Sequence, residues 1–225
     1  MIPRPAAWRP GPGASWSRPG VDLPGRILVA DVRRALLARG EPDDRAAAEV
    51  PRLALPGASR RPAAVLCALF DEDGQAHVVL TRRSSGLRSH THQVSFPGGR
   101  LDRGEDALSA AQREAHEEVG LDPSTVEVIG RLARLRTALN PAPITPFVAA
   151  LPGRPELRPN PAEVERAYTV PLIELTGPDV YRQEIWTFPD GLDRPMEFYE
   201  LIGDTVWGAT ARMLTDLLDL VLSHR

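Results

Sequence analysis

The segment from Gly99 to Leu121 constrains this chain most, because its residues fit an amphipathic helix crowded with carboxylates. We expect a helix over residues 105–119, ended by Gly120 as a C-terminal cap. At about 100° per residue, the apolar positions of this helix fall in one narrow sector. They are Leu108, Ala111, Ala115 and Val119. This stripe predicts a buried helix face.

Three glutamates crowd one side of the predicted helix. Glu114 and Glu118 are i,i+4 neighbours beside the apolar stripe, and Glu117 lies a little further round. Like charges at this spacing repel, so we expect a positive group to offset the repulsion. Mg²⁺ is typically held by a few carboxylates together with substrate phosphates. An ordinary solvated glutamate face is the alternative, but it does not predict the glycines and the arginine that accompany these residues.

The neighbouring residues extend this pattern. Gly99 ends a Gly-Gly pair, which suits a backbone carbonyl ligand because glycine permits close approach. Arg113 lies outside the carboxylate sector, where it can brace a glutamate. We expect Glu105 in the first helical turn, where its charge complements the helix dipole.

Gly99 to Leu121 resembles the Nudix box, G-x5-E-x7-R-E-U-x-E-E-x-G-U with U apolar, at every specified position. The resemblance implies an α+β fold, an α/β/α sandwich around a mixed β-sheet. It also implies Mg²⁺- or Mn²⁺-dependent hydrolysis of a nucleoside diphosphate linked to another group. Single residues acquire implied roles: Glu114, Glu117 and Glu118 as metal ligands, Gly99 as a carbonyl ligand, and Arg113 and Glu105 as residues that orient the site.

Hydrolysis of a pyrophosphate also needs a base, since the attacking water loses a proton. Glu117 and Glu118 are candidates inside the box, and Glu163, in the segment 160–164, is a candidate outside it. A solvated loop position is the alternative for Glu163. We expect clustered metal ions to activate the water and to stabilise the leaving phosphate.

The residues before the box, Leu80 to Gly99, are similar to a signature of the coenzyme A pyrophosphatase branch, roughly L-L-T-x-R-S-x-x-L-R-x-H-x-G-Q-V-x-F-P-G-G. His92 departs from the pattern, which has glycine there, and this bears on the substrate more than on the chemistry. Residues 160–172 and 206–214 also resemble this branch, so the similarity covers about residues 62–218. It implies cleavage of coenzyme A, and of acyl-CoA, to 4′-phosphopantetheine and adenosine 3′,5′-bisphosphate.

Arg83, Arg88 and His90 lie in the polar stretch before the box, where contacts with substrate phosphates are useful. An arginine fork can bind a phosphate through two hydrogen bonds. The alternatives are solvation for the arginines and packing for the histidine. All 27 basic residues are arginine, which is typical of a GC-rich genome, so most of them need no functional explanation.

The composition of the chain changes near residue 61. Residues 1–61 indicate a Pro/Arg-rich arm and a helical extension, with helices at 27–39 and 44–49 and with Trp8 and Trp16 as anchors to the body. Residues 62–225 are predicted to form the Nudix domain. Further elements are expected as strands at 63–70, 76–81, 93–96, 126–137 and 146–151, a hairpin of 184–188 with 197–202, a short helix beginning at 171–172, and a final helix at 207–223.

Composition also excludes several classes of protein. The single cysteine, Cys67, excludes a disulfide framework and a cysteine-based zinc site. No apolar run reaches the ~18 residues of a membrane span, and no secretory signal is expected, so we predict a cytoplasmic protein without a membrane partner. The formal charge of −3 gives no support to a nucleic-acid partner, so the expected partner is a small-molecule substrate. The apolar last helix and the arm are each compatible with a homodimer.

Other readings of the same motif stay open. Other substrates of the superfamily are ADP-ribose, NADH, dinucleoside polyphosphates and a capped RNA 5′ end. Two non-enzymes are alternatives of a different class: a Nudix-fold binding module and an acidic helix in a scaffold protein. The presence of Glu114, Glu117 and Glu118 together argues against the binding module, which usually lacks part of the ligand set.

Overall fold

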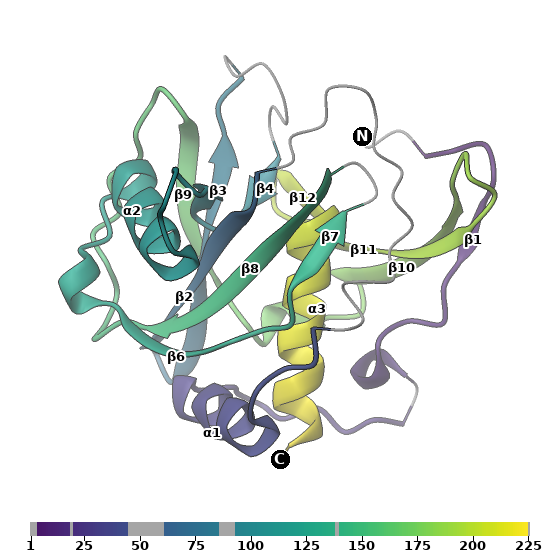
Figure 1. Cartoon of the computed structure of the whole chain (residues 1–225). Helices are drawn as coiled ribbons and strands as arrows, with labels where there is room; N and C mark the ends of the chain where they lie inside the picture. Colours follow the sequence, from purple (N-terminus) through teal and green to yellow (C-terminus); the bar gives the residue numbers. More distant parts are fainter. Residues whose placement is uncertain (1–3, 19, 45–60, 86–92, 138–139, 225) are drawn as a thin grey trace.

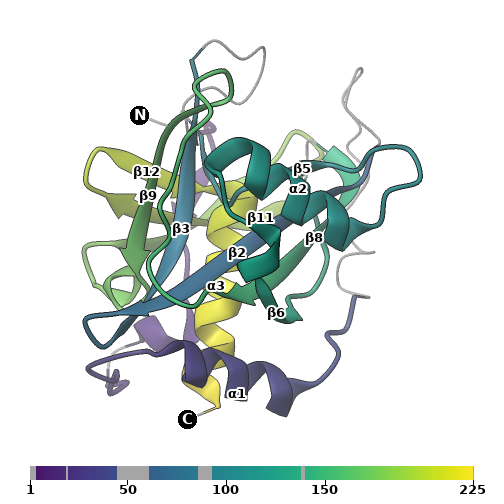
Figure 2. The same cartoon turned by 90° about the vertical axis from the view of Figure 1, so that its left-hand side faces the viewer.

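Figure 1 shows the computed structural model, which describes residues 4–18, 20–44, 61–85, 93–137 and 140–224. A large mixed β-sheet crosses the molecule, and helices cover both of its faces (Figures 1 and 2). A smaller antiparallel sheet lies beside it. The expected α/β/α sandwich, with an N-terminal helix and a C-terminal helix, is therefore confirmed.

The large sheet is built around one parallel pair, β2 (Ala63–Glu72) with β8 (Asn140–Ala150). Strand β3 (Gln75–Arg83) pairs antiparallel with β2 and with β9 (Val164–Pro171). The remaining strands are shorter: β4 (Val94–Ser95), β5 (Gly98–Arg100), β6 (Glu127–Arg131) and β7 (Leu135–Thr137). Strand β5 pairs antiparallel with the start of β2, which brings the Gly-Gly pair to the middle of the sheet.

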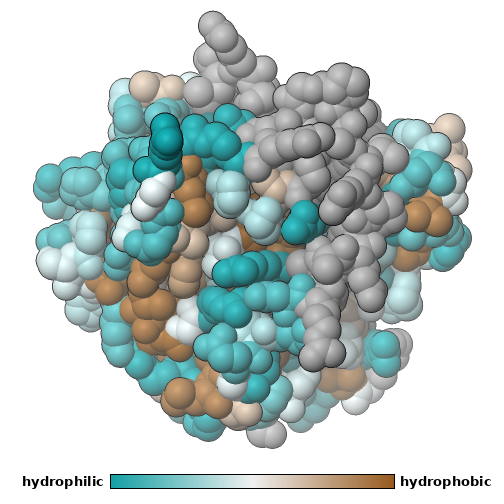
Figure 3. Space-filling model, viewed as in Figure 1, coloured by the Kyte–Doolittle hydropathy of each residue, from teal (hydrophilic) through white to brown (hydrophobic). Residues whose placement is uncertain are grey.

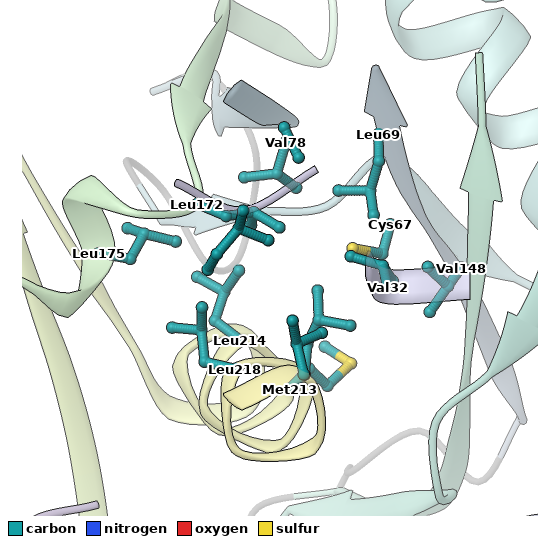
Figure 4. Close-up of a cluster of buried hydrophobic side chains, with 14 of the residues drawn as sticks. Val32, Cys67, Leu69, Val78, Val148, Leu172, Leu175, Met213, Leu214 and Leu218 are labelled. Atoms are coloured by element: carbon teal, nitrogen blue, oxygen red, sulfur yellow. The ribbon is translucent and has the colours of Figure 1, made fainter. Parts of the chain in front are cut away.

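Each face of this sheet has its own hydrophobic cluster. Helix α2 (Ala107–Val119) covers one face, and α1 (Val29–Arg39) and α3 (Gly208–Ser223) cover the other, so that α3 lies behind the sheet in Figure 2. Successive side chains of β2 point to opposite faces of the sheet, and this separates the two clusters. Leu66 and Phe70 pack with α2. Cys67 and Leu69 pack instead with α1 and α3 (Figure 4). The predicted stripe of α2 is buried at Ala111, Ala115 and Val119.

The smaller sheet has the strand order β1-β10-β11-β12. Its strands are β1 (Trp8–Pro10), β10 (Tyr181–Thr187), β11 (Asp193–Leu201) and β12 (Asp204–Trp207). The predicted late hairpin is confirmed, because β10 and β11 are antiparallel neighbours. Strand β1 adds the N-terminal segment to the edge of β10.

The two N-terminal tryptophans differ in burial. Trp16, in a short 3-10 helix at Ser15–Ser17, is 2% exposed, and its ring centroid lies 4.6 Å from that of Tyr181. It belongs to the same buried cluster as Val32 of α1 and Leu214 of α3. Trp8 is 42% exposed and lies beneath the guanidinium group of Arg4. Trp16 therefore anchors the N-terminal segment far more deeply than Trp8.

Most of the expected elements are present with shifted ends, but the strand expected at 126–137 is two strands, β6 and β7. Helix α2 begins at Ala107 because Asp106 caps it, accepting hydrogen bonds from the amides of Leu108 and Ser109. The expectation that Glu105 lies in the first helical turn is therefore wrong, since Glu105 precedes the cap. Gly120 ends the helix in the left-handed conformation, with φ of 74°, as predicted.

Two further expectations differ from the structure or fall outside it. Pro171 ends β9, and the next helical turn is a 3-10 helix at Glu174–Thr176 rather than at 171–172. Another 3-10 helix, at Pro123–Thr125, precedes β6. The helix expected at 44–49 falls, apart from Asp44, in residues 45–60, which are not described. None of the helices in the described part of the chain has both the length and the apolar character needed to cross a membrane.

Candidate active site

Three carboxylates from two parts of the chain meet at one end of α2. Glu114, Glu118 and Glu163 each offer an oxygen atom, and these atoms lie within 4.8 Å of one another. Glu114 and Glu118 lie one turn apart on α2, and Glu163 immediately precedes β9. The structure thus joins a glutamate outside the box to two glutamates inside it.

Backbone hydrogen bonds place Glu163 beside the helix. The amide of Asn160 donates to the carbonyl of Glu118 at 2.9 Å, which ties this turn to the end of α2. The side chain of Asn160 accepts from the amide of Ala162 at 3.1 Å, and this bond closes the turn. The amide of Ser84, just after β3, donates to the carbonyl of Glu163 at 2.8 Å. The backbone of Glu163 is therefore held near both α2 and β3.

Glu118 is the most buried member of the cluster. Its side chain is 2% exposed, and its two oxygens have different partners. The amide of Gly98 donates to Oε2 at 3.0 Å, and Nη1 of Arg83 donates to Oε1 at 3.3 Å. Burial raises the pKa of Glu118 to about 7, although the Gly98 hydrogen bond and the charge of Arg83 act to lower it. Burial also raises the pKa of Glu114, against the charge of Arg113.

The Gly-Gly pair lets β5 approach both β2 and α2. Gly98 has φ of 151°, and a β-carbon there would collide with the carbonyl oxygen of Ala64. A β-carbon on Gly99 would collide with the carboxylate of Glu114. Gly99, the predicted carbonyl ligand, therefore lies directly against one of the clustered carboxylates, and a larger residue there would displace it.

Arg113 contacts the carboxylates of three glutamates. Its Nε and Nη2 donate to the two oxygens of Glu105, at 2.9 and 3.0 Å. Its Nη1 lies 3.1 Å from Oε1 of Glu114 and 3.0 Å from Oε2 of Glu117. The hydrogen bonds from Arg113 lower the pKa of Glu105. Arg113 thus links Glu105 to Glu114, as a residue that orients the site would do.

The structure does not bring all the predicted site residues together. Glu117 is 54% exposed and pairs with Arg113, and the carboxylate cluster found among the described residues does not include it. Arg88, His90 and His92 lie outside the described residues. Arg83 is described, and it contacts Glu118.

Two contacts of Glu118 were not expected from the sequence. The Gly98 amide and Arg83 both contact Glu118, across 20 and 35 residues of the chain. The Pro-Gly-Gly sequence indicates a close backbone approach, but it does not say which side chain is approached. No sequence pattern pairs Arg83 with Glu118, because only the fold brings the end of β3 within reach of Glu118.

The chemistry of the cluster suits a hard divalent cation. Its donors are all carboxylate oxygens, which Mg²⁺ and Mn²⁺ prefer. The raised pKa values of Glu114 and Glu118 reflect negative charge that is poorly solvated, and a bound cation would relieve this cost. The donor set therefore fits such an ion.

Comparison with known proteins points to one family. Residues 60–191 match the NUDIX domain model. The chain is 37% identical over 145 residues to the uncharacterized Nudix hydrolase NudL of Photorhabdus laumondii, covering 64% of this chain and 76% of that protein. It is 37% identical to Nudix hydrolase 3 of Caenorhabditis elegans, covering 57% of this chain. It is 38% identical to the chloroplastic Nudix hydrolase 22 of Arabidopsis thaliana, covering 68% of this chain. These two matches span about half of each relative, 55% and 52%.

Proposed function

The chain belongs to the Nudix hydrolase family, and from this premise we propose that it hydrolyses the diphosphate of coenzyme A. The products would be 4′-phosphopantetheine and adenosine 3′,5′-bisphosphate, and acyl-CoA would be cleaved in the same way. The observation that carries the diphosphate chemistry is the cluster of Glu114, Glu118 and Glu163. The choice of coenzyme A rests on the resemblance of residues 80–99 to the signature of the coenzyme A pyrophosphatase branch.

Glu114 and Glu118 would hold Mg²⁺ or Mn²⁺, with Gly99 as a further ligand through its carbonyl group, and Glu163 lies in the same cluster. When bound, the cation acidifies water and neutralises the charge of the phosphates. Glu117 joins this set only if its carboxylate leaves Arg113, with which it pairs in the structure. Arg113 keeps Glu114 in place through its contact with Oε1.

Two of the carboxylates have different roles, cation binding for one and proton transfer for the other. Glu118 has both oxygens engaged, by the Gly98 amide and by Arg83, so we assign it to binding rather than to proton transfer. Glu163 is the better base, since it comes from a turn beside β3 rather than from the buried helix face. In the reaction a water oxygen bonds to phosphorus, the bond from phosphorus to the bridging oxygen breaks, and the Glu163 carboxylate takes the proton of the water.

The substrate would be held by residues before the box. Arg83, Arg88 and His90 would contact phosphate groups, and arginine forks suit this task. His92, which stands in place of glycine, would narrow the pocket and is the first residue to examine if another substrate is preferred. ADP-ribose, NADH, dinucleoside polyphosphates and capped RNA are the competing substrates.

A panel of substrates tests this function. The protein is incubated with Mg²⁺ or Mn²⁺ and with coenzyme A, acetyl-CoA, ADP-ribose, NADH, diadenosine tetraphosphate or 5′-triphosphate RNA, and the products are separated by chromatography. We expect coenzyme A to yield the two products named above, and we expect EDTA to stop the reaction.

The variant Glu118→Gln provides the matched control. It keeps the size of the side chain but removes the charge, and we expect a fall in kcat of at least about 100-fold. If coenzyme A stays intact while another member of the panel is cleaved, the assignment to the coenzyme A pyrophosphatase branch is wrong. If no member is cleaved with either metal, the family member is a binding module rather than a hydrolase.

A further inference from the structure

We propose that Arg83 occupies the place of the cation at Glu118 while the cation is absent, and that it turns to the substrate diphosphate once the cation binds. This inference rests on the proposed function, since it presupposes a metal at the carboxylate cluster. The observation behind it is the ion pair between Nη1 of Arg83 and Oε1 of Glu118, at 3.3 Å.

The end of β3 places Arg83 for this exchange. The register of β3 against β9 shifts between Arg82 and Arg83, so that Arg82 lies opposite Arg166 and Arg83 lies opposite Val164. The side chain of Arg82 contacts Asp204 of β12, at 3.0 Å. The side chain of Arg83 instead reaches Glu118 on α2, and its backbone lies next to the strand that follows Glu163. Arg83 is thus the arginine that β3 directs to the cluster.

The charges explain why an arginine is needed there. The side chain of Glu118 is 2% exposed, and a buried carboxylate without a positive partner is costly. Arg83 is 27% exposed, so its guanidinium group lies partly in solvent while it contacts Glu118. A cation bound at Oε1 would take the oxygen that Arg83 contacts and would also repel the guanidinium group. Cation and arginine therefore compete for the same atom.

A displaced Arg83 has an obvious new partner. The side chain is long, and it starts at the edge of the cluster where the cleaved diphosphate must lie. A guanidinium fork binds phosphate oxygens with two hydrogen bonds, so the substrate would hold Arg83 away from Glu118. Loss of Arg83 should accordingly strengthen binding of the cation and weaken binding of the substrate.

The first experiment measures Mn²⁺ binding by calorimetry, without substrate. We expect Arg83→Gln to bind Mn²⁺ roughly three- to tenfold more tightly than the wild type, because the competitor is gone. The control is Arg103→Gln, which removes the same charge from an exposed position in the loop between Gly99 and Glu105, and which should leave the affinity within about twofold. Equal or weaker Mn²⁺ binding by Arg83→Gln would overturn the inference.

The second experiment measures KM and separates this role from a structural one. For the cleaved member of the panel we expect Arg83→Gln to raise KM about tenfold or more, while its affinity for Mn²⁺ increases. Arg83→Lys keeps the charge but not the fork, so we expect a raised KM with nearly wild-type Mn²⁺ affinity. A raised KM together with weaker Mn²⁺ binding by Arg83→Gln would indicate a damaged site and would overturn the proposed exchange.

A measurement on the wild type does not depend on the variants folding well. In a spectrum of the ¹⁵N-labelled protein, the Nε–H signal of Arg83 is the one that Arg83→Lys lacks. We expect Mg²⁺ to shift this signal, and an unchanged signal at saturating Mg²⁺ contradicts the displacement of Arg83. If the wild type binds no Mn²⁺ at all, the proposed function itself fails, and the inference fails with it.

Discussion

At the scale of single residues, Glu118 carries the largest electrostatic cost in the candidate site. Its side chain is 2% exposed, and burial raises its pKa to about 7. Gly98 and Arg83 reduce this cost without removing it. The folded protein without metal therefore binds a proton at Glu118 more tightly than the unfolded chain does.

We predict that the metal-free protein loses stability as the pH rises from about 5 to 8. The folded-state pKa of Glu118, about 7, lies above the ordinary value of 4.5. Its contribution to stability is therefore fully present below the ordinary value and is lost as the pH rises through about 7. Urea unfolding in EDTA at several pH values measures this, with Glu118→Gln as the control that lacks the titrating group. The same slope in both proteins would contradict the shifted pKa.

At the scale of elements, the contact of β5 with α2 determines the position of Glu114. Strand β5 is held against β2, with Gly99 opposite Ala64. Helix α2 packs over it and brings the Glu114 carboxylate against Gly99, where a β-carbon would collide with that carboxylate. The two glycines are thus required by the approach of two elements rather than by a turn.

We predict that Gly99→Ala lowers kcat by about 10- to 100-fold, because a displacement of Glu114 by about 1 Å is enough to disturb the site. The matched control is Gly153→Ala, since a β-carbon on Gly153 meets no atom within 4 Å. Steady-state kinetics and thermal melting of both variants test this. Full activity of Gly99→Ala would show that Glu114 does not need its present position.

At the scale of the whole molecule, the N-terminal segment shares a core with the C-terminal helix. Trp16, Ile27 and Val32 are buried in the cluster that contains Leu214 of α3. The side of the molecule seen in Figure 3 also exposes hydrophobic residues at its lower left, between α2 and α1.

The division of the chain into residues 1–61 and 62–225 stays a prediction, and so does the homodimer.

We predict that Trp16→Ala destabilises the protein by about 3–5 kcal/mol, as for other buried aromatic residues. Trp8→Ala is the matched control, because Trp8 is 42% exposed, and we expect a loss of about 1 kcal/mol or less. Urea unfolding of the two variants tests the difference. Similar losses in both would mean that the N-terminal segment does not contribute to the core as a packed element.

The family, the fold class and most elements of this protein could be predicted from its amino-acid sequence. Periodicity and glycine positions are local properties, so the helix that ends at Gly120 and the hairpin of β10 and β11 follow from neighbouring residues. The pairs of charged side chains that meet in the site could not be predicted in this way. Glu163 joins Glu118 through a turn tied to α2, and Arg83 reaches Glu118 from β3, so both contacts depend on packing between distant segments. The predicted start of α2 at residue 105 was wrong, because the side chain of Asp106 accepts the hydrogen bonds of the first helical amides and the helix begins after it.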